Sequence, residues 1–409
     1  MDDSHDPHCA FCQKNNKQVK KLIAGPNVYI CESCIEKCHA LLIKSDMPQD
    51  EREAETETAT EEARVNPRDI KEFLDRYVIG QDDAKMVVSV AAYNHYKRIT
   101  NPVIGDIEID KSNILLLGPT GSGKTLLAQS LARVLEVPCV IRDATALTEA
   151  GYVGEDVETM VAALLAAAKG DVKLAERGII FIDEIDKKRS KGSGAQSRDV
   201  SGDGVQQALL RMLEGTEVTV NKRGNGEGVK VNTKNILFIV SGAFVGIDQI
   251  VTDKKTSIGF GNPKTVAATD KPLDVKAEHL IKFGMIPELV GRLPVIAALE
   301  PLTEEHLMRV LTEPRNAVTK QFQALFGLDN VELEFTEDAL RKVAKTAITD
   351  KTGARGLRAV IEKELTKVQF ELPTMAEAGL LKVTITADLV DYTFDESKIE
   401  PSVNIAKKK

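Results

Sequence analysis

The chain lacks several features that would place it in particular classes of protein. It contains no tryptophan, and aromatic residues make up only 4% of its 409 residues. No apolar run is long enough to cross a membrane as a helix, which takes about 20 residues. Positive charge is not in excess, since the net charge is −8, whereas a dedicated nucleic-acid binder usually has a basic face. The remaining composition, 43% hydrophobic and 28% charged, is ordinary for a soluble globular protein.

Targeting signals and disulfide-forming cysteines are also scarce. The start of the chain, Met1–Asp6, is acidic and has neither the basic nor the apolar stretch of a secretory signal peptide. There are six cysteines in all, which does not resemble a secreted disulfide scaffold. We therefore expect a cytoplasmic protein with no membrane partner. The length predicts two or three domains.

A glycine-rich run lies between a predicted strand, Ile114–Leu117, and a helical pattern that starts at Leu126. The glycines allow backbone N–H groups to converge on a phosphate, and the N-terminus of the following helix adds its positive dipole. Lys124 is expected to reach the β- and γ-phosphates and the Thr125 hydroxyl to contribute to a Mg²⁺ site. The predicted nucleotide-binding run comprises Pro119, Thr120, Gly121, Ser122, Gly123, Lys124, Thr125 and Leu126.

A second apolar run, Ile179–Ile182, ends in two carboxylates. Its continuous hydrophobicity is typical of a parallel strand that is buried on both faces. At the carboxyl end of such a strand we expect Asp183 to hold Mg²⁺ through water and Glu184 to act as the general base on the attacking water. Asp186 is expected to begin a helix rather than to bind a ligand.

Four cysteines form two C-x-x-C pairs with 18 residues between them: Cys9 with Cys12, and Cys31 with Cys34. This spacing is typical of a zinc ribbon, in which four thiolates complete a tetrahedral site. Two disulfides are the alternative. Cys38 lies close by, but four cysteines already fill a tetrahedron.

Composition and periodicity divide the chain into five parts. A zinc-binding domain at 1–43 precedes an acidic flexible linker at 44–65, a large ATPase domain at 66–300, a small helical domain at 301–398 and a tail at 399–409. The large domain alternates strands and helices, which predicts an α/β fold with a parallel sheet between layers of helices. The elements expected are a helix at 68–77, strands near 137–141, 179–182 and 235–240, helices at 304–326, 337–349 and 356–369, and a strand at 381–385.

Several motifs occur together in a fixed order: the cysteine pairs, the glycine-rich run, Gly151–Gly154, Ile182–Glu184, Ile258–Phe260 and Gly353–Arg355. In this combination the chain resembles the ClpX family, the AAA+ unfoldases of the Clp/HSP100 group, over nearly its whole length. The resemblance implies a treble-clef or ribbon zinc domain before an AAA+ large and small domain. It also implies a homo-hexamer that uses ATP, Mg²⁺ and Zn²⁺ to unfold protein substrates, some brought by adaptors, and to feed a ClpP-type peptidase.

The resemblance assigns roles to residues that spacing alone would not have selected. Val78 and Ile79 would pack against the adenine base. Arg292 would reach the γ-phosphate bound by a neighbouring subunit, and Arg355 would connect the small domain to the state of the nucleotide. Ser241 is a weaker candidate for a polar sensor of the attacking water.

The resemblance also assigns two protein-binding loops. Tyr152 and Val153, flanked by glycines, would grip the substrate in the pore, and the basic stretch 187–198 resembles a second pore loop. The apolar pair in Ile258, Gly259 and Phe260 would dock on the peptidase.

One departure from the family pattern concerns substrate entry. Many members carry an Arg-Lys-His tripeptide where this chain has only Lys222 and Arg223 within 220–228. This predicts altered recognition of substrate tags. Two other functions stay open: a remodelling chaperone that needs no protease, and a nucleic-acid remodelling ATPase whose zinc ribbon uses Lys14, Lys17, Lys20 and Lys21.

Overall fold

The structure is a computed structural model in which the chain forms two compact units, Met1–Val65 and Asn66–Lys409. The residues described are 9–12, 15, 19, 21–25, 28–32, 34–35, 66–101, 103–104, 107–148, 155–189, 200–220, 228–252 and 274–394. Among these residues, no helix is both long and apolar enough to cross a membrane.

The N-terminal unit is built on one antiparallel hairpin. Strand β1 (Leu22–Gly25) pairs with β2 (Val28–Cys31), in a register that places Leu22 opposite Cys31. The turn that carries the first cysteine pair attaches to this hairpin, because the Ala10 N–H donates to the carbonyl of Tyr29 at 2.8 Å. Cys9 and Cys31 are both buried, so cysteines occupy the centre of the unit where a larger protein would have an apolar core.

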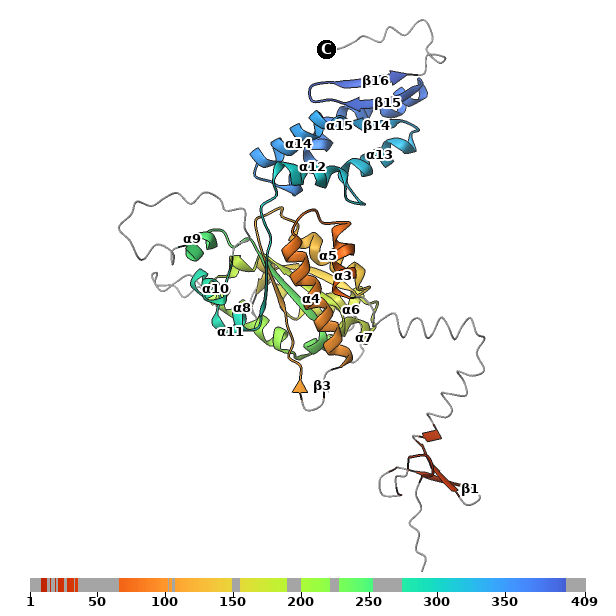
Figure 1. Cartoon of the computed structure of the whole chain (residues 1–409), viewed down its shortest axis with the longest axis vertical. Helices are drawn as coiled ribbons and strands as arrows, with labels where there is room; N and C mark the ends of the chain where they lie inside the picture. The colour runs from red at the N-terminus through yellow and green to blue at the C-terminus, as the bar shows by residue number, and fades with distance from the viewer. Residues whose placement is uncertain are drawn as a thin grey trace, which may run out of the picture. The chain divides into compact units, whose positions relative to one another are not determined.

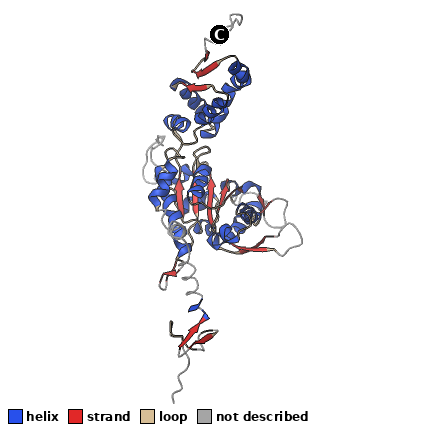
Figure 2. Cartoon of the chain, turned by 90° about the vertical axis from the view of Figure 1, so that its right-hand side faces the viewer, coloured by secondary structure: helices blue, strands red, loops and turns tan. Residues whose placement is uncertain are grey.

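The second unit contains a five-stranded parallel sheet in the order β13-β5-β12-β9-β6. The strands are β5 (Ile114–Leu117), β6 (Cys139–Asp143), β9 (Ile179–Asp183), β12 (Leu237–Gly242) and β13 (Val295–Ala298). Every residue of β5 and β12 is buried, as expected for strands covered on both faces. Figure 2 shows these strands between helices on either side. The predicted α/β fold is confirmed, although β13 was not predicted.

Helices and short strands surround the sheet (Figure 1). The helices are α3 (Pro67–Asp75), α4 (Asp82–Thr100), α5 (Lys124–Val134), α6 (Thr159–Ala167), α7 (Val172–Glu176), α8 (Val200–Glu214), α9 (Ile247–Thr252), α10 (Ala277–Phe283) and α11 (Pro287–Gly291). The short strands are β3 (Val103–Ile104), β4 (Ile107–Glu108), β7 (Leu147–Thr148), β8 (Glu155–Asp156), β10 (Glu217–Val220) and β11 (Val229–Asn232), and three 3₁₀ turns are Ala144–Ala146, Ile185–Lys188 and Thr233–Asn235.

After Pro301 the chain forms a smaller layer of helices with its own apolar core. It comprises α12 (Glu304–Thr312), α13 (Val318–Leu328), β14 (Glu332–Phe335), α14 (Glu337–Thr349), α15 (Ala354–Glu377), β15 (Leu380–Ile385) and β16 (Val390–Phe394). The three strands form one sheet in the order β14-β15-β16. This agrees with the expected mostly helical second domain.

Two helix predictions in this region were wrong, both at prolines. The single helix expected at 304–326 is two helices, because Pro314, which follows α12 closely, has no N–H to donate. The helix expected at 356–369 instead continues through Pro373 to Glu377 and stops before Gly379, whose φ is +93°. A lone proline in a long helix removes one hydrogen bond, and the packing of Leu365, Val368 and Leu372 compensates for it.

Candidate functional site

The glycine-rich run wraps the junction between β5 and α5. Gly118, Gly121 and Gly123 all have positive φ, at 151°, 80° and 102°. A Cβ atom at Gly118 would lie 2.7 Å from the Leu299 carbonyl oxygen, and one at Gly121 would lie 2.8 Å from that of Thr352. The loop therefore needs glycine for both its conformation and its close contacts. Gly123 precedes α5, so the helix N-terminus faces the loop.

Lys124, the first residue of α5, is buried against its own loop. Its Nζ donates to the carbonyl oxygens of Gly118 at 2.7 Å and Pro119 at 3.1 Å. Burial lowers the pKa of Lys124, and the negative charge of Asp183 partly opposes this. A buried ammonium held only by neutral carbonyls would gain from a phosphate, as expected for a phosphate-binding lysine.

Asp183 lies at the carboxyl end of β9, where three elements meet. Its Oδ2 accepts from the Thr125 hydroxyl at 3.3 Å, and its Oδ1 accepts from the Ser241 hydroxyl at 3.0 Å. Ser241 is completely buried in β12, the strand next to β9. Carboxylate and hydroxyl oxygens are the ligands that Mg²⁺ prefers, so Asp183 and Thr125 fit the proposed metal site. The structure also favours Ser241, the weaker sequence candidate, as a member of this site.

Glu184 follows Asp183 in a left-handed backbone conformation, with φ at 57°. Its N–H donates to Asp183 Oδ1 at 3.0 Å. Such a conformation is uncommon outside glycine and clusters at functional sites, where the surroundings hold it. Its carboxylate therefore directly follows the one that the Thr125 and Ser241 hydroxyls bind.

Asp186 binds backbone N–H groups of the segment that follows β12. It is buried in the 3₁₀ turn Ile185–Lys188, and its carboxylate accepts the N–H groups of Ala243 and Phe244, both at 3.3 Å. It therefore stabilises the backbone just after β12 and, as predicted, lies in the first turn of a helical segment.

Val78 and Ile79, the proposed adenine contacts, are buried beside the glycine-rich run. A Cβ at Gly123 would lie 3.8 Å from Val78 Cγ1. Gln81 joins this segment to the glycine-rich run and to the end of the large domain: its amide exchanges hydrogen bonds with the backbone of Glu300 at 2.8 and 2.9 Å and donates to the Ser122 carbonyl at 3.4 Å. The sequence analysis did not assign this role, although Gln81 stands two positions after Ile79.

Lys85 also contacts the segment that contains Val78 and Ile79, and the sequence analysis did not assign it a role. It is 2% exposed, its Nζ donates to the Val78 carbonyl at 3.0 Å, and it forms an ion pair with Asp75. No sequence signal distinguishes this lysine from the other cations of an amphipathic helix.

Arg355 brings the second domain to the nucleotide site. It stands in the first turn of α15, and one guanidinium nitrogen lies 3.9 Å from Asp183 Oδ2. The same segment contacts the glycine-rich run, since the Ala354 N–H donates to the Gly121 carbonyl at 3.4 Å. The side chain of Arg355 is 60% exposed, so an incoming phosphate could compete for it.

Arg292 is not brought to this site. Its carbonyl accepts from Asn113 Nδ2 at 2.9 Å. Asn113 directly precedes β5, whereas the glycine-rich run directly follows it, so the two lie at opposite ends of a strand about 13 Å long. Arg292 therefore lies away from the site that contains Lys124 and Asp183.

Several expected residues lie outside the described part of the chain. These are Tyr152, Val153, Lys222, Arg223, Ile258, Gly259 and Phe260, together with 190–198 of the second pore loop. Their roles remain predictions from the resemblance.

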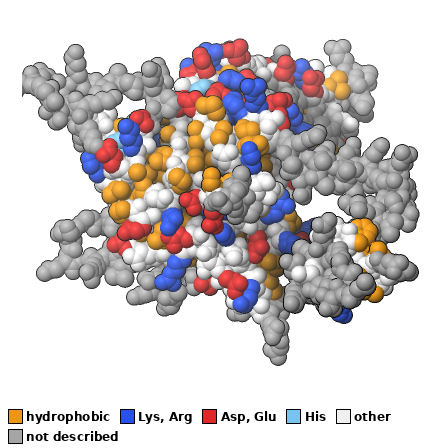
Figure 3. Space-filling model, turned by 60° about the horizontal axis from the view of Figure 1, so that its bottom comes forward, with side chains coloured by type: hydrophobic (Ala, Val, Ile, Leu, Met, Phe, Trp, Pro, Cys, Tyr) orange, Lys and Arg blue, Asp and Glu red, His pale blue; other side chains and the backbone are white. Residues whose placement is uncertain are grey.

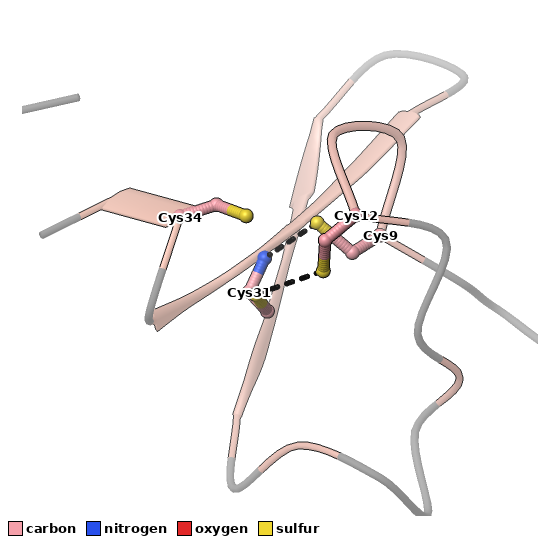
Figure 4. A group of neighbouring side chains, drawn as sticks. All are labelled: Cys9, Cys12, Cys31 and Cys34. Atoms are coloured by element: carbon pink, nitrogen blue, oxygen red, sulfur yellow. Dashed lines mark hydrogen bonds between the residues drawn. The ribbon is translucent and has the colours of Figure 1, made fainter. Parts of the chain in front are cut away.

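The four cysteines of the N-terminal unit converge, as Figure 4 shows. Their sulfur atoms all lie within 4.8 Å of one another, and those of Cys12 and Cys31 are 3.7 Å apart. Zn–S bonds of about 2.3 Å in a tetrahedron put neighbouring sulfurs about 3.8 Å apart, whereas a disulfide needs about 2.0 Å. All four are free thiols. The geometry fits zinc and does not fit the alternative of two disulfides.

The surroundings of the four cysteines shift the pKa values of Cys9 and Cys34. Burial would raise the pKa of Cys9, but backbone N–H groups of Cys12, Cys31 and Phe11 outweigh it and lower that pKa to about 6. Burial and the neighbouring sulfurs raise the pKa of Cys34 to about 12. Four thiolates cannot gather here unless a cation offsets their charge, and zinc would supply it.

Removal of the metal should unfold the N-terminal unit alone. Zinc supplies about 10–16 kcal/mol in small domains of this kind, and the ATPase unit has an independent apolar core. We expect a chelator to make residues 1–43 of the full chain sensitive to protease while ATP hydrolysis persists. Cys12→Ser should behave in the same way without chelator. A protease-resistant, metal-free unit with oxidised cysteines would contradict the zinc assignment.

Comparisons with known proteins find family models for three segments of the chain. The family model of the ClpX C4-type zinc finger matches residues 7–44, that of the AAA domain (Cdc48 subfamily) matches 109–296, and that of the C-terminal, D2-small domain of ClpB protein matches 302–379. The ATP-dependent Clp protease ATP-binding subunit ClpX of Treponema denticola is 47% identical in an alignment that covers 96% of each chain. The matched segments include the four cysteines, the glycine-rich run and the Asp183 cluster.

Proposed function

Since this chain belongs to the ClpX family of AAA+ ATPases, we propose that it works as a ring of six subunits that unfolds proteins and threads them into a ClpP-type peptidase. It is an ATP-dependent unfoldase that uses ATP with Mg²⁺ and carries zinc in its N-terminal finger. The free thiols among the described cysteines accord with the reducing cytoplasm that we propose as its compartment.

The observation that carries the proposal is the convergence of both domains on Asp183. Thr125 and Ser241 bind its carboxylate from the large domain, and Arg355 approaches it from α15 of the small domain. Loss of the γ-phosphate would change the charge that Arg355 faces. Hydrolysis can therefore move one domain against the other, with Gln81 and Glu300 at the junction.

The position of Arg292 supports a ring. The site contains Lys124, Asp183 and Glu184 and is approached by Arg355 of the small domain, whereas Arg292 stands at the other end of β5. We propose that each subunit provides Arg292 to its neighbour's site. Arginines placed in this way accelerate hydrolysis about 10³–10⁵-fold in other phosphoryl-transfer enzymes.

Handling of the polypeptide is assigned to the loops outside the described residues. We propose that Tyr152 and Val153 grip the substrate in the pore, and that Ile258, Gly259 and Phe260 dock on the peptidase. Two buried apolar side chains would give weak binding from one loop, but six loops on one ring would bind together through their high effective concentration.

The nucleic-acid alternative was placed on Lys14, Lys17, Lys20 and Lys21 of the zinc ribbon, of which Lys21 is among the described residues. On the face shown in Figure 3, cationic and anionic side chains of the described residues are interspersed rather than gathered into a basic patch. The net charge of −8 would also oppose association with a phosphate backbone.

Removal of Ile258–Phe260 should separate unfolding from proteolysis. We expect the deletion to abolish degradation of a stable tagged substrate by the cognate ClpP-type peptidase, because docking is lost. ATP hydrolysis and unfolding, followed by loss of the substrate's native fluorescence, should persist. Unchanged peptidase binding would disprove the docking assignment, and unfolding without any peptidase-dependent degradation in the unaltered protein would favour the remodelling chaperone.

A further inference from the structure

Arg292 forms an ion pair with Glu214, a residue to which the proposed function gives no role. Glu214, the last residue of α8, accepts from Arg292 Nε at 3.0 Å, and the same carboxylate oxygen lies 2.8 Å from a terminal guanidinium nitrogen. The side chains are 55% and 41% exposed, so the pair contributes little to stability. We therefore consider the effect of the ion pair on the direction of the Arg292 side chain.

The backbone of Arg292 is already fixed without this pair. Its N–H donates to the Leu289 carbonyl at 3.0 Å, and its own carbonyl accepts from Asn113 at 2.9 Å. Beyond Cβ, the side chain of Arg292 has one hydrogen-bond and ion-pair partner among the described residues, Glu214. Glu214 therefore determines the direction of a long, otherwise rotatable side chain.

The helix that carries Glu214, α8, is held in place by the hydrogen bonds of a buried glutamine. Gln206, in the middle of α8, is completely buried and uses both ends of its amide. Its Nε2 donates to the Lys188 carbonyl at 2.8 Å, and its Oε1 accepts the Ile286 N–H at 2.9 Å. Lys188 ends the 3₁₀ turn that follows Glu184, and Ile286 precedes α11, which Arg292 follows. The helix that carries Glu214 is thus fixed both to the turn after Glu184 and to the residue that precedes α11, the helix directly before Arg292.

The ion pair with Glu214 uses only part of the Arg292 guanidinium. Glu214 engages one edge, formed by Nε and one terminal nitrogen, through a single oxygen. A guanidinium has five N–H donors in a fixed plane, so the other terminal nitrogen can still bind a phosphoryl oxygen. We propose that Glu214 is a positioning residue that pre-orients Arg292 toward the γ-phosphate held by a neighbouring subunit. This inference depends on the role proposed above for Arg292.

Glu214→Ala should lower kcat for ATP hydrolysis with little change in KM. A freely rotating arginine spends little time in the productive direction, and misplacement of a catalytic group can cost about 10²-fold, so we expect a loss of about 10- to 100-fold. Glu214→Gln keeps an oxygen that accepts from Nε–H and should recover most of kcat. Steady-state hydrolysis by the full-length protein, with ring assembly checked by sedimentation, measures both variants.

Glu217→Ala is the matched control. Glu217 lies three residues beyond Glu214 and forms a similarly exposed ion pair with Lys230 at 2.7 Å, away from Arg292. Its loss should leave kcat unchanged. An unchanged or raised kcat in Glu214→Ala, or a loss that Glu214→Gln shares in full, would overturn the positioning role.

Arg292→Ala, measured in parallel, separates this inference from the proposal beneath it. We expect that variant to lose hydrolysis, and the double variant Arg292→Ala with Glu214→Ala to lose no more than Arg292→Ala alone, because the two residues act as one unit. If Arg292→Ala keeps its kcat, the arginine's proposed role fails. If it loses kcat while Glu214→Ala does not, only the positioning role fails.

Discussion

Glu184→Gln should bind ATP and assemble as the unaltered protein does, but hydrolyse ATP about 10²–10⁴-fold more slowly, the usual contribution of a general base. The exchange preserves the size of the side chain and removes its ability to accept a proton from water. Asp183, Thr125 and Ser241 are untouched, so the metal site survives. The left-handed backbone at Glu184 is tolerated about as well by glutamine, since neither side chain is branched at Cβ.

The measurement is phosphate release at saturating ATP, with nucleotide binding followed separately by fluorescence of a labelled analogue. Turnover near the unaltered rate would show that Glu184 is not the base. Loss of nucleotide binding along with turnover would instead indicate that the substitution disturbs Asp183, whose Oδ1 accepts the N–H of residue 184.

Lys124→Ala should produce the opposite pattern, with loss of nucleotide binding itself. The ammonium is buried between the carbonyls of Gly118 and Pro119, where a phosphate would gain a charge-assisted hydrogen bond. Such bonds contribute about 1.5–3 kcal/mol each, so two phosphate contacts predict a Kd raised about 100-fold or more.

Equilibrium binding of the labelled analogue measures this Kd, with Glu184→Gln as the control that binds but does not hydrolyse. The fold should persist, because the core of the ATPase unit lies in the sheet and its helices and not at Lys124. A Kd within a few-fold of the unaltered value, in a folded protein, would remove Lys124 from the phosphate site.

The sequence was most informative where chemistry depends on neighbouring positions. The run from Gly118 to Thr125 could be interpreted in one step because its glycines, its lysine and its flanking strand and helix are contiguous. The cysteine pairs were equally clear, since a C-x-x-C turn sets two sulfurs together whatever surrounds it. The buried strands β5 and β9 followed from unbroken apolar runs, which need no knowledge of their neighbours.

The misjudged helices show that local signals can also be overlooked. Pro314 lies within the span that was predicted as one helix. Because proline has no N–H to donate, its presence was sufficient reason to predict two helices there. Pro373 is the reverse case, because packing of α15 against the small-domain core overrides the local preference.

What the sequence determined by itself was thus the inventory of this protein: an anion-binding loop, two acids after a buried strand and a four-thiol metal site. Only the tertiary structure decided how those parts combine. Thr125 and Ser241 each lie 58 positions from Asp183, and they meet it because β9 and β12 are adjacent and β12 also pairs with β5. Glu214 and Arg292 meet across 78 positions, and Arg292 stands at the far end of β5 from Lys124. Apolar periodicity reports which face of a strand is buried but not which strands pair, so these contacts depend on strand order.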